Sequence, residues 1–557
     1  MVFHTMPRVC CRASGYLGTA AADCSRQGTL YPRTAWTSVW PRVRAAALLA
    51  GTLAAFLCAG VRPGVAASAR ATPRPWLHFT SARNWLNDPN GLIRFDGRYH
   101  LFFQYNPFAN RWGHMSWGHA TSRDLLRWRE WPVAIPEDAR EMIFSGSAVY
   151  DRDNTSGLAA AGARGPLVAL YTGALRGPNH GQRQDLAFSV DGGRTWKKYP
   201  RNPVLDLGSR NFRDPHVFRD RATGRWILAA VLATRHQVAI FDSPDLIHWR
   251  HRSDFGPAGA VDGVWECPDL FELPVADAAG MRLWVLKVDV QNSGPPGGSG
   301  AQYFLGHFDG GQFTSIEPAG SPPRWVDYGA DFYAATSWAN LPHGVDRHLW
   351  IGWMNNWRYA AATPTSPWRG QMSLPREVQL KSIAKRITLV QRPARELRAA
   401  RAQHIQVAAW TLDDARRTLA LPAGAGALEI DLRLRPLGAR RAGIIIGTGS
   451  GALTEQTVIG YDAGSRAVFV DRSRSGRLPS AGFAAPASAP LRGVGAVVRL
   501  QIFVDRYSIE VFVNGGARVL TEQVFPRKMY DRLQVFAAGG RAAVDSLELW
   551  RLRPPTP

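Results

Sequence analysis

The sequence predicts an all-β protein, a five-bladed β-propeller followed by a β-sandwich. Between residues 76 and 385 the chain is rich in Trp, Gly, Pro and strand-forming residues and shows almost no helical periodicity. One short motif recurs within this stretch. The last part of the chain, residues 406–553, contains short segments in which apolar and polar residues alternate, which is typical of a sandwich.

The recurring motif combines a serine, an aspartate and a tryptophan. Ser122–Trp128 returns as Ser243–Trp249, and a variant, Ser189–Trp196, lies between them. Each copy follows an apolar strand, so we expect the aspartate to cap a hairpin turn and the tryptophan to pack beneath it. Repeats tens of residues apart in an all-β chain indicate propeller blades, and with four strands per blade this stretch would form about five. Copies on separate blades cannot share one ligand, so we expect these aspartates to be structural.

A polar, arginine-rich linker is expected over residues 386–405, ahead of the sandwich. Asn514-Gly515 is a hairpin-turn dipeptide within the sandwich. The alternating segments that predict sandwich strands are Leu428–Leu434, Leu500–Val504, Ser508–Val513 and Leu547–Leu552.

Residues 1–70 are expected to form a leader that ends in a signal peptide. Arg42 and Arg44 precede an apolar run over 45–60 and a small-residue region over 66–69. Four of the five cysteines lie in this leader, which leaves Cys267 alone in the body of the chain. We therefore predict a secreted or periplasmic protein that, in its mature form, has no membrane span, no internal disulfide and no cysteine-based zinc site.

The net charge does not indicate a nucleic-acid-binding protein. The formal charge is +23, to which residues 1–69 contribute seven arginines and one aspartate, a net +6. The remaining arginines are scattered, with no basic run and no recognition motif. A composition bias toward arginine explains the charge better than a nucleic-acid partner does. The sequence leaves the oligomeric state open.

No cofactor and no metal are predicted. Residues 447–452 resemble a dinucleotide-binding loop, but a strand-like segment follows where a helix would be needed. Residues 151–154 could begin a calcium loop but lack its later ligands. His114 and His119 have no third zinc ligand nearby.

Three acids stand at the heads of predicted strands. Asp88 lies in the turn sequence 87–91, where proline and glycine make a rigid corner, and a carboxylate held there suits a nucleophile. Asp214 repeats the device of an acid before proline, and Glu266 lies between a tryptophan and a cysteine. Each acid alone could be structural. Together, at the heads of successive blades, they would converge on the propeller axis and supply the nucleophile and proton donor that glycoside cleavage needs.

At these residues the chain resembles glycoside hydrolase family 32, which comprises the invertases, inulinases, levanases and related β-fructosidases. A segment of the predicted sandwich, Val504–Phe512, resembles a motif of the family's C-terminal domain. The blocks that carry the resemblance occur in the family's order: Asn87–Gly91, Gln104–Pro107, Phe144–Ser147, Arg213–Pro215 and Glu266–Pro268. The family's fold agrees with the fold predicted above.

The resemblance implies that Asp88 is the nucleophile, Glu266 the general acid/base and Asp214 the transition-state stabiliser of a reaction that retains configuration. No cofactor takes part. A pocket for the terminal fructose would use Trp85, Asn87, Gln104, Trp112, Phe144, Ser145, Arg213 and Trp357.

The resemblance also implies the kind of substrate. Residues 331–334, 352–359 and 364–377 are similar to exo-acting levanases and inulinases more than to plant-type sucrose specialists. The expected activity is release of fructose from levan or inulin, and from sucrose. A fructosyltransferase that uses the same covalent intermediate, a sucrose-specific invertase and a non-catalytic fructan-binding propeller remain alternatives.

Overall fold

The structure is a computed structural model that describes residues 71–554 apart from 179, 343–346, 422–425, 450–453 and 492–496. The expected leader and signal peptide, 1–70, lie outside the described residues. Strands are the dominant secondary structure of the described chain. Its helices are short 3₁₀ turns: η1 (Ala233–Arg235), η2 (Ala360–Ala362), η3 (Arg395–Ala400) and η4 (Ala481–Ala484). Within these ranges no helix is long and apolar enough to cross a bilayer.

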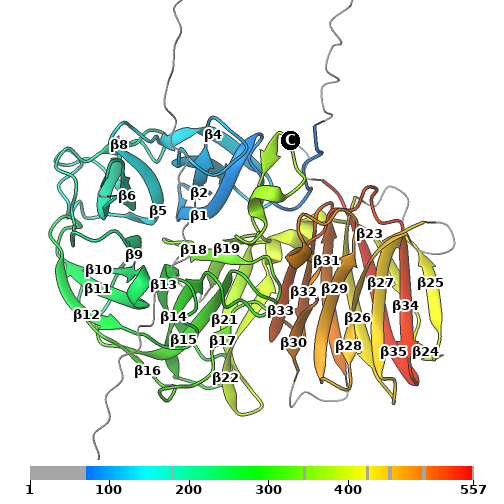
Figure 1. Ribbon diagram of the computed structural model, residues 1–557. Coiled ribbons are helices and arrows are strands. Elements are labelled where there is room, and N and C mark those ends of the chain that lie inside the picture. The colour runs from blue at the N-terminus through cyan, green and yellow to red at the C-terminus, as the bar shows by residue number, and fades with distance from the viewer. Residues whose placement is uncertain are drawn as a thin grey trace, which may run out of the picture. The chain divides into compact units, whose positions relative to one another are not determined.

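Five antiparallel sheets form the blades of a propeller, as predicted (Figure 1). Blade one contains β1 (Asn84–Phe95), β2 (Arg98–Asn106), β3 (Ser116–Ser122) and β4 (Trp128–Ile135), with β20 (Trp368–Arg369) added parallel to β1. Blade two contains β5 (Glu141–Tyr150), β6 (Leu167–Leu175), β7 (Gln182–Ser189) and β8 (Lys197–Lys198). Blade three contains β9 (Phe212–Arg219), β10 (Trp226–Leu232), β11 (Gln237–Ser243) and β12 (Arg250–Phe255). Blade four contains β13 (Trp265–Pro274), β14 (Arg282–Val290), β15 (Gly300–Phe308), β16 (Phe313–Ser315) and β17 (Arg324–Trp325). Blade five contains β18 (Tyr333–Ser337), β19 (His348–Trp353), β21 (Arg376–Ile383) and β22 (Arg386–Pro393).

The first strand of each blade lies at the centre of the ring. β1 contacts β5, β5 contacts β9, β9 contacts β13, β13 contacts β18, and β18 contacts β1. This closed cycle surrounds the propeller axis (Figure 1). Residues at equivalent places on the five inner strands therefore face one another.

The recurring serine–aspartate–tryptophan motif makes the turn between the third and fourth strands of a blade, as predicted. In blade one, Asp124 Oδ1 accepts hydrogen bonds from the backbone N–H groups of Leu126 and Arg127, and Trp128 Nε1 donates to the carbonyl of Leu125. Blades two and three repeat this arrangement. Blade four has a fourth copy that the sequence analysis missed, in which Asp309 caps the turn. The aspartates are thus occupied by their own backbone.

The second unit of sheets is a sandwich. One sheet contains β23 (Arg401–Val407), β24 (Trp410–Asp413), β26 (Ala427–Arg435), β31 (Val498–Asp505), β32 (Ser508–Val513), β33 (Arg518–Gln523) and β35 (Arg541–Leu552). The other contains β25 (Arg416–Ala420), β27 (Arg441–Thr448), β28 (Glu455–Asp462), β29 (Ala467–Arg474), β30 (Ala487–Pro490) and β34 (Arg532–Ala538). Alternate residues such as Ile430 and Leu432 from one sheet and Ile444 and Ile446 from the other share one buried core. The alternating segments predicted from the sequence are strands of the first sheet.

The expected linker, residues 386–405, is ordered into secondary structure instead. Residues 386–393 form β22, which pairs with β21 along its whole length as the outer strand of blade five. η3 follows, and β23 then pairs with β35 of the sandwich. The polar, arginine-rich composition reflects the exposed faces of an edge strand and not a free connection.

Buried charges join the propeller to the sandwich. His78, ahead of β1, lies 2.9 Å from Asp505 Oδ2 through Nδ1 and 2.9 Å from Glu510 Oε1 through Nε2. Arg376, at the start of β21, donates to Glu510 Oε2 at 2.7 Å and to Asp327 Oδ2 at 2.9 Å. The side chains of His78, Asp505, Glu510 and Arg376 are fully buried. The motif at 504–512 therefore attaches the sandwich to the propeller.

Candidate active site

Each of the five inner strands contributes one polar side chain to a common site at the propeller axis. These are Asp88 from β1, Ser145 from β5, Asp214 from β9, Glu266 from β13 and Tyr333 from β18. Hydrogen bonds and sulfur contacts, described below, connect all five into one cluster. The three acids predicted from the sequence are thus brought together across about 180 residues of chain.

A break in strand register accompanies each of these residues. The pairing of all five inner strands shifts beside the site residue, as between Ile143 and Gly146 in β5. Asp214, Cys267 and Ala334 have positive φ angles of 61°, 46° and 53° at these breaks. A bulge turns a side chain away from the ordinary alternation of a strand. Here it directs these polar side chains toward the propeller axis.

Asp88 is held by two neighbours. Ser145 Oγ donates to Asp88 Oδ2 at 2.7 Å, and Asn87 Nδ2 donates to Oδ1 at 3.0 Å. Burial raises the pKa of Asp88 above its ordinary value, the hydrogen bond from Ser145 opposes this, and the charge of Glu266 adds to it. Because the hydrogen bonds stabilise the ionised form, they favour a carboxylate that can act as a nucleophile.

Cys267 places Asp88 and Asp214 beside each other. Its Sγ lies 3.8 Å from Asp88 Oδ2 and 3.7 Å from Asp214 Oδ2, and its backbone N–H donates to Asp214 Oδ2 at 3.0 Å. Burial raises the pKa of Asp214, which the nearby Arg213 guanidinium opposes. Cys267 was not among the predicted site residues; the structure shows it buried between the two carboxylates.

Glu266 faces the same cluster from the next strand. Tyr333 Oη donates to Glu266 Oε2 at 2.5 Å, and Arg213 Nη2 donates to Oε1 at 3.2 Å. Arg213 Nε also lies 3.8 Å from Asp214 Oδ2, so this guanidinium bridges two of the acids. Tyr333 was not among the predicted site residues. Its signal was its place at the head of the fifth inner strand, which could be recognised only once the blades had been assigned.

A buried ion pair lies on the strand next to Glu266. Asp289 is directly opposite Glu266 in the pairing of β13 with β14. Lys287 Nζ donates to Asp289 Oδ2 at 2.6 Å and to the carbonyl of Cys267 at 2.7 Å. Lys287 therefore holds the backbone of the bulge that carries Cys267. Neither Lys287 nor Asp289 was among the predicted site residues.

The predicted aromatic residues divide into two groups. Trp85 is only 1% exposed, so it does not offer a face to a sugar. Its Nε1 donates a hydrogen bond to Asn87 Oδ1 at 2.8 Å. The ring of Trp357 is stacked on the ring of Trp85, with centroids 6.1 Å apart. Trp357 is half-buried, and Trp112 is 47% exposed with its ring against half-buried Phe144. Trp85 thus orients the amide of Asn87, whereas the other three have surface available for a ligand.

Gln104 completes the set of predicted residues. It is buried, and its Nε2 donates to Asn90 Oδ1 at 3.1 Å, while Asn90 Nδ2 donates to the carbonyl of Asp88. Gln104 therefore supports the turn that carries Asp88. A cavity of about 20 Å³, lined by Ser145, Asp214 and Cys267 among others, lies beside the acids and is large enough for about one water molecule.

The sequence matches one family along most of its length. The glycosyl hydrolases family 32 N-terminal domain matches residues 78–393, and the family 32 C-terminal domain matches residues 396–551. A levanase of Bacillus subtilis (strain 168) is 43% identical over 486 residues, which cover 86% of this chain and 70% of the levanase. An extracellular exo-inulinase of Aspergillus ficuum is 41% identical over 499 residues, which cover 84% of this chain and 92% of the inulinase.

Solved structures show the same architecture. The exo-inulinase from Aspergillus awamori superposes with a TM-score of 0.80 at 38% identity, covering 86% of this chain and 98% of the inulinase. A β-fructofuranosidase from Schwanniomyces occidentalis, complexed with fructosyl-erythritol, gives a TM-score of 0.79 at 32% identity, covering 86% of this chain and 97% of that enzyme. These matches cover most of the chain, and three acids lie together at the axis of its five-bladed propeller. The chain therefore belongs to glycoside hydrolase family 32.

Proposed function

We propose that the chain is a fructan β-fructosidase that releases terminal fructose from levan or inulin, and from sucrose, with retention of configuration. This proposal rests on the site at the propeller axis, where Asp88, Asp214 and Glu266 converge around Cys267. The similarity to enzymes named levanase and exo-inulinase supports the choice of substrate. The leader expected at residues 1–70 and the extracellular naming of the Aspergillus relatives support export from the cell.

In the proposed mechanism Asp88 attacks the anomeric carbon of the terminal fructose, and Glu266 protonates the oxygen of the departing sugar. A fructosyl ester on Asp88 results. Glu266 then takes a proton from a water molecule, whose oxygen attacks the same carbon and releases fructose. In a retaining pair we expect the two carboxyl groups to be about 5–5.5 Å apart.

The remaining groups bind and steady the sugar. Asp214 would hold fructose hydroxyls and balance the positive charge of the oxocarbenium-like transition state. Arg213 and the amide of Asn87 offer hydrogen-bond donors for hydroxyls. Trp112, Phe144 and Trp357 offer aromatic surface for the apolar side of the sugar.

Replacing Asp88 by asparagine tests the proposed nucleophile. We expect the initial rate of fructose release from levan to fall by roughly a thousandfold or more, because the amide cannot form the covalent intermediate. The matched control is Asp245→Asn in the blade-three turn, whose carboxylate caps its own backbone and should leave the rate nearly unchanged. Undiminished release by Asp88→Asn would remove Asp88 from its role.

A timed product profile separates the alternatives. Fructose as the sole product of levan and inulin from the first minutes indicates attack at chain ends, whereas a ladder of oligomers would show internal cleavage. Oligosaccharides accumulating at high sucrose would show fructosyl transfer. Turnover of sucrose alone would indicate an invertase, and binding of levan without turnover would indicate a non-catalytic propeller.

A further inference from the structure

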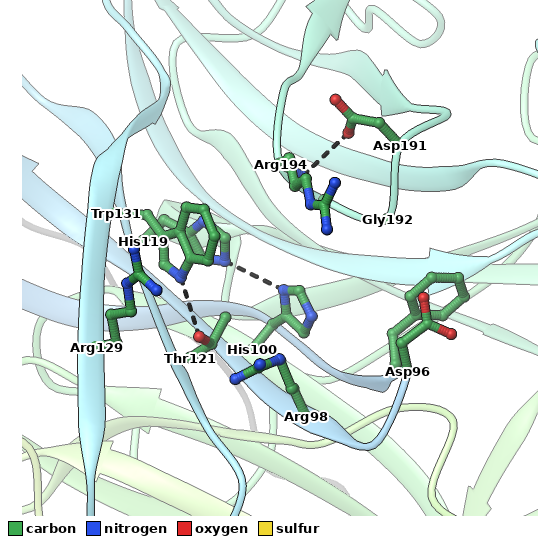
Figure 2. A pocket seen from close by; sticks show the side chains of 12 residues that line it. Asp96, Arg98, His100, His119, Thr121, Arg129, Trp131, Asp191, Gly192 and Arg194 are labelled. Atoms are coloured by element: carbon green, nitrogen blue, oxygen red, sulfur yellow. Dashed lines mark hydrogen bonds between the residues drawn. The ribbon is translucent and has the colours of Figure 1, made fainter.

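A second cavity lies between blades one and two, at the end of β1 opposite to Asp88. Its volume is about 260 Å³. Phe95, in its lining, follows Asp88 by seven residues of strand, and at about 3.3 Å per residue the two are roughly 20 Å apart along the chain. The lining comes from the β1–β2 turn, β2, β3, β4 and the β7–β8 turn, and Figure 2 shows its side chains. This cavity is separate from the candidate active site.

Three arginine side chains border the cavity. Arg98 leads into β2, Arg129 lies on β4, and Arg194 extends from the β7–β8 turn toward the centre of the view in Figure 2. Within the described chain none of the three guanidinium groups makes an ion pair with a carboxylate. The cavity therefore holds positive charge that the protein does not neutralise.

The two carboxylates in the lining are already engaged. Asp96 binds an arginine of the β5–β6 loop through both oxygens, at 2.8 and 3.0 Å. Asp191 caps its own turn, accepting hydrogen bonds from the backbone N–H groups of Arg194 and Thr195 and from the hydroxyl of Thr195. Among the described side chains, neither carboxylate forms an ion pair with Arg98, Arg129 or Arg194. When the arginine that binds Asp96 is counted as well, the four guanidinium groups exceed the two carboxylates by two charges.

Two neutral histidines form the inner wall. His100 Nδ1 lies 3.1 Å from His119 Nε2, and the rings are stacked. Burial lowers the pKa of His100 to about 4 and that of His119 well below its ordinary value. One proton lies between His100 Nδ1 and His119 Nε2, and each neutral ring carries one N–H. The second hydrogen is therefore on an outer nitrogen, either His100 Nε2 or His119 Nδ1. Neither outer nitrogen has a partner among the described side chains. The wall therefore offers one further donor without adding a charge.

The tryptophan in the lining is poorly suited to binding a sugar by stacking. The ring of Trp131 is stacked with His119, with centroids 6.0 Å apart and an angle of 23° between planes. The guanidinium of Arg129 lies over the same ring, 4.9 Å from its centroid. Because its neighbours already contact this indole, a second fructan-binding site is not the chemistry that the cavity favours.

We propose that this cavity binds a phosphate group, either as the free ion or as the terminal group of a small organic molecule. Guanidinium groups match the oxygens of phosphate in charge and geometry, and a hydrogen bond between charged groups is roughly twice as strong as a neutral one. One water molecule takes about 30 Å³ of liquid volume, so the cavity has room for a phosphate group and a small organic part attached to it.

Calorimetric titration with inorganic phosphate and with glucose 6-phosphate, at constant ionic strength, tests the proposal. We expect saturable binding to the wild type. Arg98→Ala and Arg194→Ala should each weaken it by about tenfold or more, since each removes a charged donor. The matched control is Arg221→Ala, in the exposed β9–β10 turn, which removes the same charge elsewhere and should leave binding unchanged.

The two probes distinguish the sources of the phosphate group. Tighter binding of glucose 6-phosphate indicates an organic phosphate, and equal affinity for both probes indicates the free ion. Absence of saturable heat with either probe would overturn the proposal, as would equal weakening in Arg221→Ala and Arg194→Ala. Fructose release from levan should be the same in the Arg98→Ala and wild-type proteins, because the cavity is remote from Asp88.

Discussion

His78 should make the stability of the protein depend on pH. Burial alone would lower its pKa, but the hydrogen bonds and charges of Asp505 and Glu510 outweigh burial and raise the pKa of His78 to about 9. In the unfolded chain a histidine titrates near 6.5. The stabilising contribution of His78 is therefore complete below pH 6.5, declines between 6.5 and 9, and is lost above 9.

The size of this contribution follows from the difference between the two pKa values. A rise from 6.5 to about 9 corresponds to about 3 kcal/mol, at 1.36 kcal/mol per pKa unit. The pKa values of Asp505 and Glu510 are lowered despite burial from ordinary values of 3.8 and 4.5, so their contributions are complete above those values and are lost in acid. At about 2.1 cal/mol/K of unfolding entropy per residue, a described chain of roughly 480 residues that unfolds as one unit shifts its melting temperature by roughly 3 °C for 3 kcal/mol.

Melting temperatures of the wild type and His78→Gln between pH 5.5 and 9.5 measure the effect. The variant should melt below the wild type at pH 6, and the gap should narrow by roughly 3 °C toward pH 9.5. His404→Gln is the matched control, since His404 forms an exposed pair with Glu548 of a kind that contributes little. Parallel curves for the wild type and His78→Gln across this range would refute the reasoning.

Three further substitutions test the site and the fold. Tyr333→Phe removes the donor to Glu266, and we expect kcat on levan to fall about tenfold, with a smaller loss on an aryl fructoside whose leaving group needs no proton. Ser145→Ala removes a hydrogen bond that lowers the pKa of Asp88, so the acid limb of the kcat/KM profile should move to higher pH, and Ser145→Thr should restore part of it. Gly516→Ala places a Cβ 1.6 Å from a carbonyl oxygen of β22 at a φ of +93°, and urea unfolding should show a loss of roughly 2–4 kcal/mol.

Local patterns predicted the fold because the forces that make turns and strands act over a few residues. Asp124 and Trp128 bind backbone groups within four positions of themselves, so the motif identifies its turn from the sequence alone. The missed copy at Asp309 has Phe313 where the other blades have tryptophan, which shows that the aspartate and not the indole defines the turn. The linker was misjudged because an exposed edge strand and a free connection have similar composition.

The predicted acids, too, were recognisable because each has a local signature, an acid beside proline or cysteine at the head of a strand. Tyr333 has no such signature, and its role depends on Glu266 in another blade. His78 and its partner Asp505 are separated by 427 residues, and no periodicity connects them. Trp85 was expected to contact a sugar, but its burial follows from packing against Trp357.

The sandwich also supports the active site, through the segment that leads into β18. Asp327 accepts hydrogen bonds from the backbone and hydroxyl of Thr521, and Asp331 accepts one from the backbone N–H of Gln523 and pairs with the buried Arg472. Two residues after Asp331, Tyr333 donates to Glu266, and Ala334 then adopts a positive φ that costs about 1–2 kcal/mol in an L-residue. Such a conformation persists only where the surrounding structure over-determines it. By fixing both carboxylates just ahead of this bulge, the sandwich holds the fifth inner strand in the conformation that brings its hydroxyl to the acids.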